Sequence, residues 1–163
     1  MADRNETSPL LGALLRMPVD AVRHRMLEDL HAAGFTDIVP AHFAVLRYPG
    51  PDGRRPSDVA AEAGMSRQAM NYLLGELEKL GYLERHDDER DRRSRRIELT
   101  ERGLAVRRVM RASVTKIEAE LADSLGDEAL GRFREMLLAV NGSPFVKEYR
   151  ESTGQPQVFA TPE

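Results

Sequence analysis

The chain is 163 residues long, contains no cysteine and carries a formal net charge of -3 at pH 7. This length suits one domain with a sizeable core. The lack of cysteine excludes disulfides, thiolate metal sites and sensing by thiol oxidation. No stretch is long and apolar enough to span a membrane, and the N-terminus lacks a basic and then apolar signal. We therefore expect a single domain over residues 1–163, located in the cytoplasm.

The first third of the chain is predicted to be helical. Over residues 8–33 the apolar side chains recur at helical spacing and form one stripe. Pro9 suits a first helical turn, whereas Pro18 is expected to bend or split the helix. A shorter helix is expected from about Pro40 to Arg47. The segment YPGPDGRR follows it as a loop, because proline and glycine exclude regular structure there.

Two helices separated by a glycine turn are predicted next. Pro56 and Ser57 start the first helix, with the Ser57 hydroxyl expected to bond a free backbone amide, and Gly64 ends it in the left-handed conformation of a sharp turn. Ser66 is the expected cap of the second helix, whose leucines recur at helical spacing on a buried face. The outer surface of this helix keeps four side chains: Arg67, Gln68, Asn71 and Tyr72.

After Gly81 the pattern changes from helical spacing to alternation. Tyr82 and Leu83 open a strand, HDDERDRRS forms a polar hairpin tip, and Ile97 and Leu99 alternate with charged residues on the return strand. Four of the hairpin's arginines lie at or next to this tip: Arg90, Arg92, Arg93 and Arg95. Such a hairpin can lie along a nucleic-acid duplex and place cations near phosphates or in the minor groove.

The C-terminal part is predicted to contain two helices. Thr100 caps a long helix that reaches about Leu125, and Gly126 ends it. Asp127 starts the next helix, which has an apolar face. The polar tail after about Arg150 is expected to be disordered.

The hairpin also contains a recognisable pattern: aspartate, any residue, arginine, then serine or alanine, followed by an apolar strand and Leu-Thr-x-x-Gly. The matching residues are Asp91, Arg92, Arg93, Ser94, Ile97, Leu99, Thr100 and Gly103. With this pattern the chain resembles the MarR family (multiple antibiotic resistance regulator family), over roughly residues 8 to 148. The resemblance implies a mainly α fold with a small β-hairpin wing. It assigns residues 8–33 and 104–148 to dimerisation helices and residues 40–103 to a winged helix-turn-helix lobe that binds DNA.

The resemblance also implies a function: a homodimeric, sequence-specific regulator of transcription that binds a pseudo-palindromic operator in double-stranded DNA, most commonly as a repressor. The residues expected at the major groove and its flanking phosphates are Ser66, Arg67, Gln68, Asn71 and Tyr72. Arg90, Arg92, Arg93 and Arg95 are expected at the DNA backbone or the minor groove, while the family's aspartate at the position of Asp91 holds the wing in shape. Acidic residues interrupt these arginines, which predicts modest nonspecific affinity.

Members of the family often bind a small anionic or aromatic effector between the dimerisation helices and the DNA-binding lobe. The residues that we assign to the border of such a pocket are His31, His42, Tyr48 and Arg111. No metal site, cofactor or enzymatic activity is predicted, because zinc-ligand spacing, phosphate loops and catalytic motifs are missing from the sequence. Two alternatives stay open. The apolar stripes could pack only within one chain, and the protein could be a dimeric protein-interaction module that does not bind DNA.

Overall fold

The computed structural model describes residues 9–46, 51–88 and 91–155, with only the backbone described for residues 88 and 91–94. Its elements, in chain order, are α1 (Leu11–Ala32), the 3-10 helix η1 (Pro40–His42), α2 (Phe43–Leu46), α3 (Pro56–Ala63), α4 (Arg67–Lys79), β1 (Leu83–Asp88), β2 (Asp91–Leu99), α5 (Glu101–Leu125), α6 (Asp127–Asn141) and α7 (Pro144–Thr153). The predicted fold class, mainly α with a small β-hairpin wing, is confirmed.

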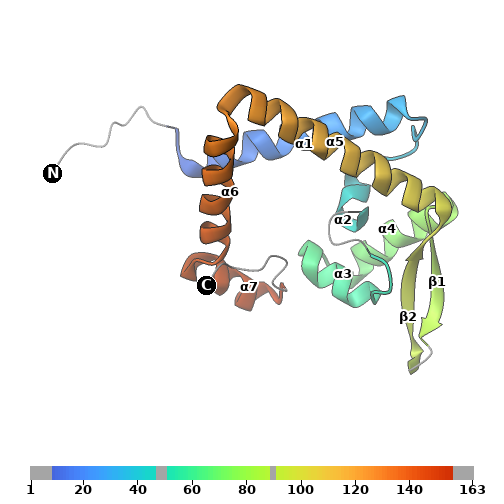
Figure 1. Ribbon diagram of the computed structural model, residues 1–163. Coiled ribbons are helices and arrows are strands. Elements are labelled where there is room, and N and C mark those ends of the chain that lie inside the picture. Colours follow the sequence, from blue (N-terminus) through green and yellow to red (C-terminus); the bar gives the residue numbers. More distant parts are fainter. Residues whose placement is uncertain (1–8, 47–50, 89–90, 156–163) are drawn as a thin grey trace.

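The helices divide the molecule into a lobe and a long helical frame (Figure 1). The frame consists of α1 and α5, which pack along one another, and of α6 and α7, which turn away from the C-terminal end of α5 (Figure 1). The lobe consists of α2, α3, α4 and the β1–β2 hairpin, which hang from the N-terminal half of α5 (Figure 1). The hairpin therefore projects beside α4 as a wing.

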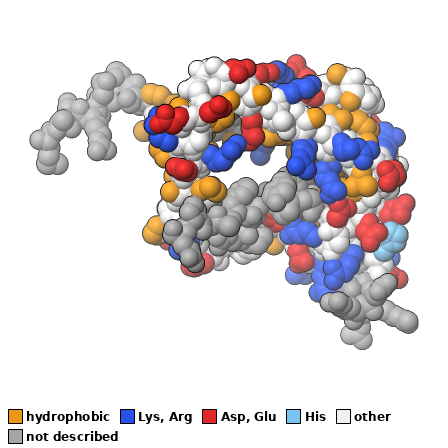
Figure 2. Space-filling view, in the orientation of Figure 1, with side chains coloured by type: hydrophobic (Ala, Val, Ile, Leu, Met, Phe, Trp, Pro, Cys, Tyr) orange, Lys and Arg blue, Asp and Glu red, His pale blue; other side chains and the backbone are white. Residues whose placement is uncertain are grey.

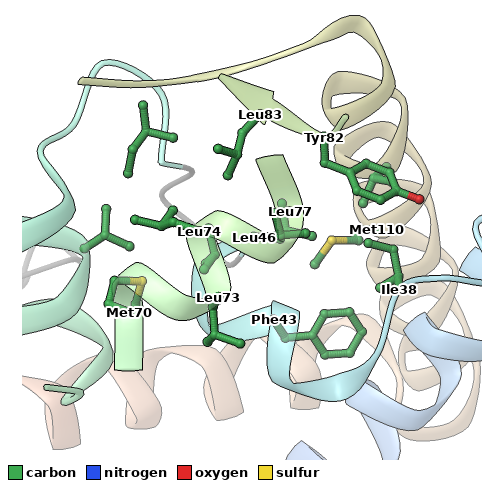
Figure 3. Close-up of a cluster of buried hydrophobic side chains, with 14 of the residues drawn as sticks. Ile38, Phe43, Leu46, Met70, Leu73, Leu74, Leu77, Tyr82, Leu83 and Met110 are labelled. Carbon is green, nitrogen blue, oxygen red and sulfur yellow. The ribbon is translucent and has the colours of Figure 1, made fainter. Parts of the chain in front are cut away.

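The hydrophobic core lies inside the lobe. The buried face of α4 supplies Met70, Leu73, Leu74 and Leu77, as its helical spacing predicts (Figure 3). Around these residues pack the buried side chains of the other elements: Leu30, Ile38, Phe43, Val45, Leu46, Val59, Ala60, Tyr82, Leu83, Ile97, Val106 and Met110. The hairpin base and the start of α5 thus share one core with the helix whose outer surface is predicted to meet DNA.

The predicted turns and caps in the lobe are largely confirmed. Gly64 adopts a left-handed conformation with φ of 63°, and the Ser66 hydroxyl accepts the backbone N–H of Ala69 at 3.1 Å. Thr100 caps α5 by accepting the N–H of Gly103 at 3.2 Å. The expected cap at Ser57 is wrong, because α3 already begins at Pro56 and the Ser57 hydroxyl donates to the Asp58 carboxylate instead.

Three expectations for the frame are also corrected. Helix α1 begins at Leu11, so Pro9 precedes the helix, and α1 runs through Pro18 unbroken, because the loss of one backbone donor leaves the neighbouring hydrogen bonds in place. The tail is helical further than predicted, since α7 extends to Thr153. Ser143 caps α7 by accepting the N–H of Val146 at 3.4 Å.

The loop before α3 joins the wing. Gly53 donates its N–H to the carbonyl of Ile97 at 2.7 Å, and Ile97 donates to the carbonyl of Arg54 at 3.0 Å. The described part of the predicted loop therefore adds a short antiparallel bridge to β2, which the prolines and glycines around it do not suggest.

Substitution of Gly103 by alanine should destabilise the protein. An added Cβ at Gly103 would overlap the backbone carbonyl of Tyr82 and press on Leu99. Forced overpacking of this kind typically costs about 1 to 3 kcal/mol. Gly131→Ala is the matched control, because Gly131 also lies within a helix but has open space around it, and alanine there should stabilise α6 by about 0.5 to 1 kcal/mol. Chemical denaturation measures both changes, and equal effects at the two positions would contradict this packing.

His42 should make the stability depend on pH. Burial lowers the pKa of His42 below its ordinary value of 6.5, although Glu76 and Asp37 oppose the shift. As the pH falls below about 6.5, His42 becomes protonated in the unfolded chain before it does so in the folded chain. The stability that neutral His42 contributes is therefore present above pH 6.5 and is lost as the pH falls through the folded pKa. His42→Gln should flatten the slope of unfolding free energy against pH below 6.5 by at most about 1.4 kcal/mol per pH unit. The exposed His24→Gln is the control, and an unchanged slope in His42→Gln would refute the assignment.

Candidate nucleic-acid interface

The N-terminal turns of α4 present a polar surface to solvent. The cap at Ser66 fixes where the helix starts, and the buried residues on its inner face fix how it is rotated. Arg67, Gln68 and Asn71 are exposed, and no hydrogen-bond or ion-pair partner holds their side chains within the described part of the chain. Guanidinium and amide groups in such a position can form paired hydrogen bonds with base edges in the major groove.

Tyr72 extends the same surface, but its hydroxyl already forms a hydrogen bond within α4. Its side chain is 66% exposed, and its hydroxyl donates to the Glu76 carboxylate at 3.0 Å. This hydrogen bond, followed by the negative charge of Glu76, raises the pKa of Tyr72, so the phenol stays protonated. To donate to a phosphate instead, the hydroxyl must leave Glu76.

The wing is an antiparallel hairpin in which Leu83 pairs with Leu99 at the base. Toward the tip Asp87 pairs with Arg95, and the register shifts between Asp87 and Asp88. Arg95 is exposed, with Nε 3.8 Å from an Asp87 carboxylate oxygen, and a pair this exposed contributes little stability. The Arg95 guanidinium is therefore available to a phosphate.

The other predicted wing residues are described less fully. Asp91, Arg92 and Arg93 lie in β2, and their side chains are outside the described residues. Arg90 lies outside them altogether. The backbone thus places β2 on the wing without placing these four side chains.

An ion pair joins the wing to α4. Arg85 of β1 donates from Nε and Nη2 to one Glu78 carboxylate oxygen, at 2.9 and 2.5 Å. Arg85 and Glu78 are each partly buried, which strengthens such a pair relative to a solvated one. The sequence reasoning did not find this contact, although a glutamate near the end of one helix and an arginine early in the next strand can meet across a tight turn.

A large cavity separates the lobe from the frame. Its volume is about 1850 Å³, and it is lined by α1, η1, α2, the α3–α4 turn, α4 and the middle of α5. Basic side chains gather beneath α5, where the surface is hollowed (Figure 2). The arginines that line the cavity are Arg23, Arg107, Arg108 and Arg111. Apolar groups such as Phe43 and Met110 line it as well.

The three described residues predicted for an effector pocket are not brought together there. Arg111 lines the cavity, whereas His31 and His42 do not. The His31 imidazole is bonded to the carbonyl of Ile38 at 2.9 Å, and His42 is buried and accepts the N–H of Val39 at 3.4 Å. Tyr48 lies outside the described residues. The closely spaced arginines of α5, Arg107, Arg108 and Arg111, were the feature of the sequence that could have predicted this wall of the cavity.

Other kinds of site receive no support from the described residues. Within residues 9–46, 51–88 and 91–155, no group of three or more histidine, aspartate or glutamate side chains is placed to hold a metal ion. None of the helices described is long and apolar enough to cross a membrane.

Known proteins share both sequence and fold with this chain. A sequence model of the MarR family matches residues 36–94, which span the lobe and most of the wing. The transcriptional repressor MprA of Escherichia coli (strain K12) is 29% identical over 106 residues, which are 63% of this chain and 60% of that protein. The chain therefore matches less than two thirds of the length of that relative.

Two solved structures of the transcriptional repressor CouR are also similar. CouR bound to a 23-mer DNA duplex is 28% identical with a TM-score of 0.66, over 86% of this chain and 98% of CouR. CouR from Rhodococcus jostii RHA1 bound to p-coumaroyl-CoA is 25% identical with a TM-score of 0.61, over 80% of this chain and 90% of CouR. With its winged lobe, its long frame helices and these likenesses, the chain is similar to members of the MarR family.

Proposed function

We propose that the protein is a sequence-specific, DNA-binding regulator of transcription that acts as a homodimer, and that it is a repressor released by a small molecule. The observation that carries the proposal is the exposed polar end of α4, held beside a projecting arginine-bearing wing. Both elements share one buried core, so their spacing is set before DNA arrives.

Each element has a distinct role in this proposal. Side chains of α4 contact base edges and the phosphates beside them: Ser66, Arg67, Gln68, Asn71 and Tyr72. The wing arginines contact the backbone or the minor groove: Arg90, Arg92, Arg93 and Arg95. Asp91 shapes the wing tip. The likeness to MprA and to DNA-bound CouR, both repressors, supports this assignment.

The dimer follows from apolar surface that one chain leaves uncovered. The frame exposes large apolar side chains on α1, on the end of α5 and along α6 and α7: Leu11, Leu14, Leu15, Met17, Val19, Leu121, Leu125, Phe133, Met136, Val140, Phe145 and Tyr149. A patch of this extent is typical of an interaction surface. We assign residues 8–33 and 104–148 to dimerisation and residues 40–103 to DNA binding, so that a two-fold axis presents two copies of α4 to successive major grooves.

The cavity is the proposed effector site. Its arginines attract an anion, and its apolar walls suit an aromatic or aliphatic body. It lies between α4 and the frame, so an occupant can influence how the two are placed relative to one another. The complex of CouR with p-coumaroyl-CoA, a molecule with both chemistries, supports this class of ligand.

The proposal includes neither catalysis nor a cofactor. A regulator of this kind acts on the chromosome, so we place the protein in the cytoplasm. The protein-interaction alternative would leave Gln68 and Asn71 as a solvated helix face and would require no binding to duplex DNA.

Substitution of the α4 side chains should reduce sequence-specific binding. Gln68→Ala or Asn71→Ala should cost about 1 to 3 kcal/mol on a duplex selected from genomic fragments, because each removes hydrogen bonds to a base edge. Binding to a random duplex should stay nearly unchanged, since phosphate contacts dominate there. Fluorescence anisotropy with both duplexes measures the two affinities.

Arg95→Ala provides the contrasting variant in the same experiment. Loss of a phosphate contact should weaken binding to both duplexes and reduce the slope of affinity against salt concentration by about one. Equal losses on selected and random duplexes for Gln68→Ala would refute the role given to α4. If no genomic fragment is enriched at all, the interaction-module alternative replaces this proposal.

A charge on the exposed face of α6 should break the dimer. Met136 is 60% exposed in the single chain, so Met136→Glu should leave the monomer fold intact, as followed by far-ultraviolet circular dichroism. Two buried carboxylates across a symmetric interface should raise the dimer dissociation constant at least about a hundredfold. Lys79→Glu, at an exposed position in α4 outside the segments assigned to dimerisation, is the control for altered charge. Analytical ultracentrifugation that finds Met136→Glu still dimeric would contradict the assignment of this face.

A further inference from the structure

One of the four cavity arginines differs from the others. Arg23, Arg108 and Arg111 are exposed, and within the described part of the chain none of them has an ion-pair or side-chain hydrogen-bond partner. Arg107 lines the same cavity but donates from its guanidinium to the Asp52 carboxylate. At the far end of the cavity wall, the Glu118 carboxylate forms an ion pair with the Arg134 guanidinium at 3.1 Å. The free positive charge is therefore concentrated next to Arg107.

Asp52 connects Arg107 to the base of the wing. One carboxylate oxygen of Asp52 accepts from Arg107, and the other accepts the backbone N–H of Leu99 at 2.7 Å. Leu99 is the last residue of β2, directly before the cap of α5. A single carboxylate thus joins a cavity-lining side chain to the junction between the wing and the frame.

The segment around Asp52 is fastened to the wing at further points. Gly53 and Arg54 form the backbone bridge to Ile97, and the Arg96 guanidinium donates to the Gly53 carbonyl. The Arg54 side chain pairs with Glu62 in α3. Residues 52–54 therefore act as a strap that holds β2 against the lobe, and Asp52 is the end of the strap nearest the cavity.

We propose that Arg107 is the positioning residue through which an anion in the cavity acts on the wing. The inference rests on the proposed function only in taking the cavity as an effector site. An anion beside Arg108 and Arg111 competes with Asp52 for Arg107, and a guanidinium that turns to the ligand leaves Asp52 without its cationic partner. The strap then holds Leu99 less firmly, and the wing loses its fixed angle to α4.

The energetics favour such an exchange. The side chains of Arg107 and Asp52 are 48% and 38% exposed, and ion pairs this open to water are weak. A ligand anion among several arginines in a partly enclosed cavity offers stronger attraction than one solvated carboxylate does. Because a ligand shifts an equilibrium only by its difference in affinity between two states, the ligand must prefer the state in which Arg107 has left Asp52.

The same lining defines the ligand class. Large apolar side chains share the cavity with the arginines: Met26, Phe43, Leu46, Leu73, Met110 and Val114. The occupant is therefore an amphiphile with an apolar body and a carboxylate or phosphate at one end.

Amide hydrogen exchange at Leu99, measured by NMR on the DNA-free protein, tests the connection. Arg107→Ala should speed Leu99 exchange about two- to fivefold, the range that loss of a half-exposed ion pair supports. Arg108→Ala is the matched control, because it removes a neighbouring cavity arginine without touching Asp52, and it should leave Leu99 unchanged. In an Asp52→Asn background, Arg107→Ala should have no further effect. An unchanged exchange rate of the Leu99 amide in Arg107→Ala, or fully additive effects of Asp52→Asn and Arg107→Ala on that rate, overturns the proposal.

The ligand step uses naphthoate and its uncharged amide as probes. Naphthoate should speed Leu99 exchange in the wild-type protein to the level of Arg107→Ala, and it should add nothing in that variant. The amide should have no effect. If naphthoate leaves the exchange rate of the Leu99 amide in the wild-type protein unchanged, or if the uncharged amide raises it equally, the role of the anion is overturned. Because neither measurement involves DNA, a failure here is distinct from a failure to bind an operator.

Discussion

The packing of Tyr82 at the base of the wing is the constraint on which the arrangement of this protein depends. The ring is fully buried, with Phe35 at a centroid distance of 6.3 Å and the Arg102 guanidinium 4.5 Å above it. Its hydroxyl donates to Asp37, which also accepts from Arg102 at 2.7 Å. Burial and the hydrogen bond to Asp37 raise the pKa of Tyr82, so it remains a neutral donor. One side chain therefore ties the segment after α1, the wing and the start of α5 together.

The packing around Tyr82 explains how a small lobe can hold both α4 and the wing rigidly. The carbonyl of Tyr82 lies against Gly103 and accepts the N–H of Thr100 at 3.1 Å, so the wing base and the N-terminus of α5 approach as closely as backbones can. On the other side, Arg85 fastens β1 to α4 through Glu78. The exposed surface of α4 and the described backbone of the wing consequently keep a fixed separation, while the cavity beneath α5 leaves a place where that separation can be altered.

Local signals in the sequence predicted the lobe well. Caps at Ser66 and Thr100, a left-handed turn at Gly64 and leucines at helical spacing each act within a few residues, so they can be read without knowledge of the fold. Helix α7 was not predicted, although a serine before a proline is a local signal for the start of a helix. The surface of α4 was predicted correctly as exposed, whereas its contacts with DNA remain a prediction.

Local signals in the sequence could not predict the cavity, because α1, α2, α4 and α5 come together there only through tertiary packing. His31 and His42 looked suitable by residue type, but one is bonded to a backbone carbonyl and the other supports the core. The strap shows the same limit. Nothing near Asp52 in the sequence indicates that its carboxylate spans from Arg107 to the backbone of Leu99.

Together, α4 and the wing are proposed to bind duplex DNA. The most direct measurement is NMR of the labelled protein titrated with a duplex selected from genomic fragments, following the side-chain amide signals of Gln68 and Asn71 and the backbone amides of β2. These signals should shift together and saturate at one duplex per dimer, while the backbone signals of α6 stay in place. Shifts confined to α6 and α7, with the Gln68 and Asn71 amides unmoved, would contradict it.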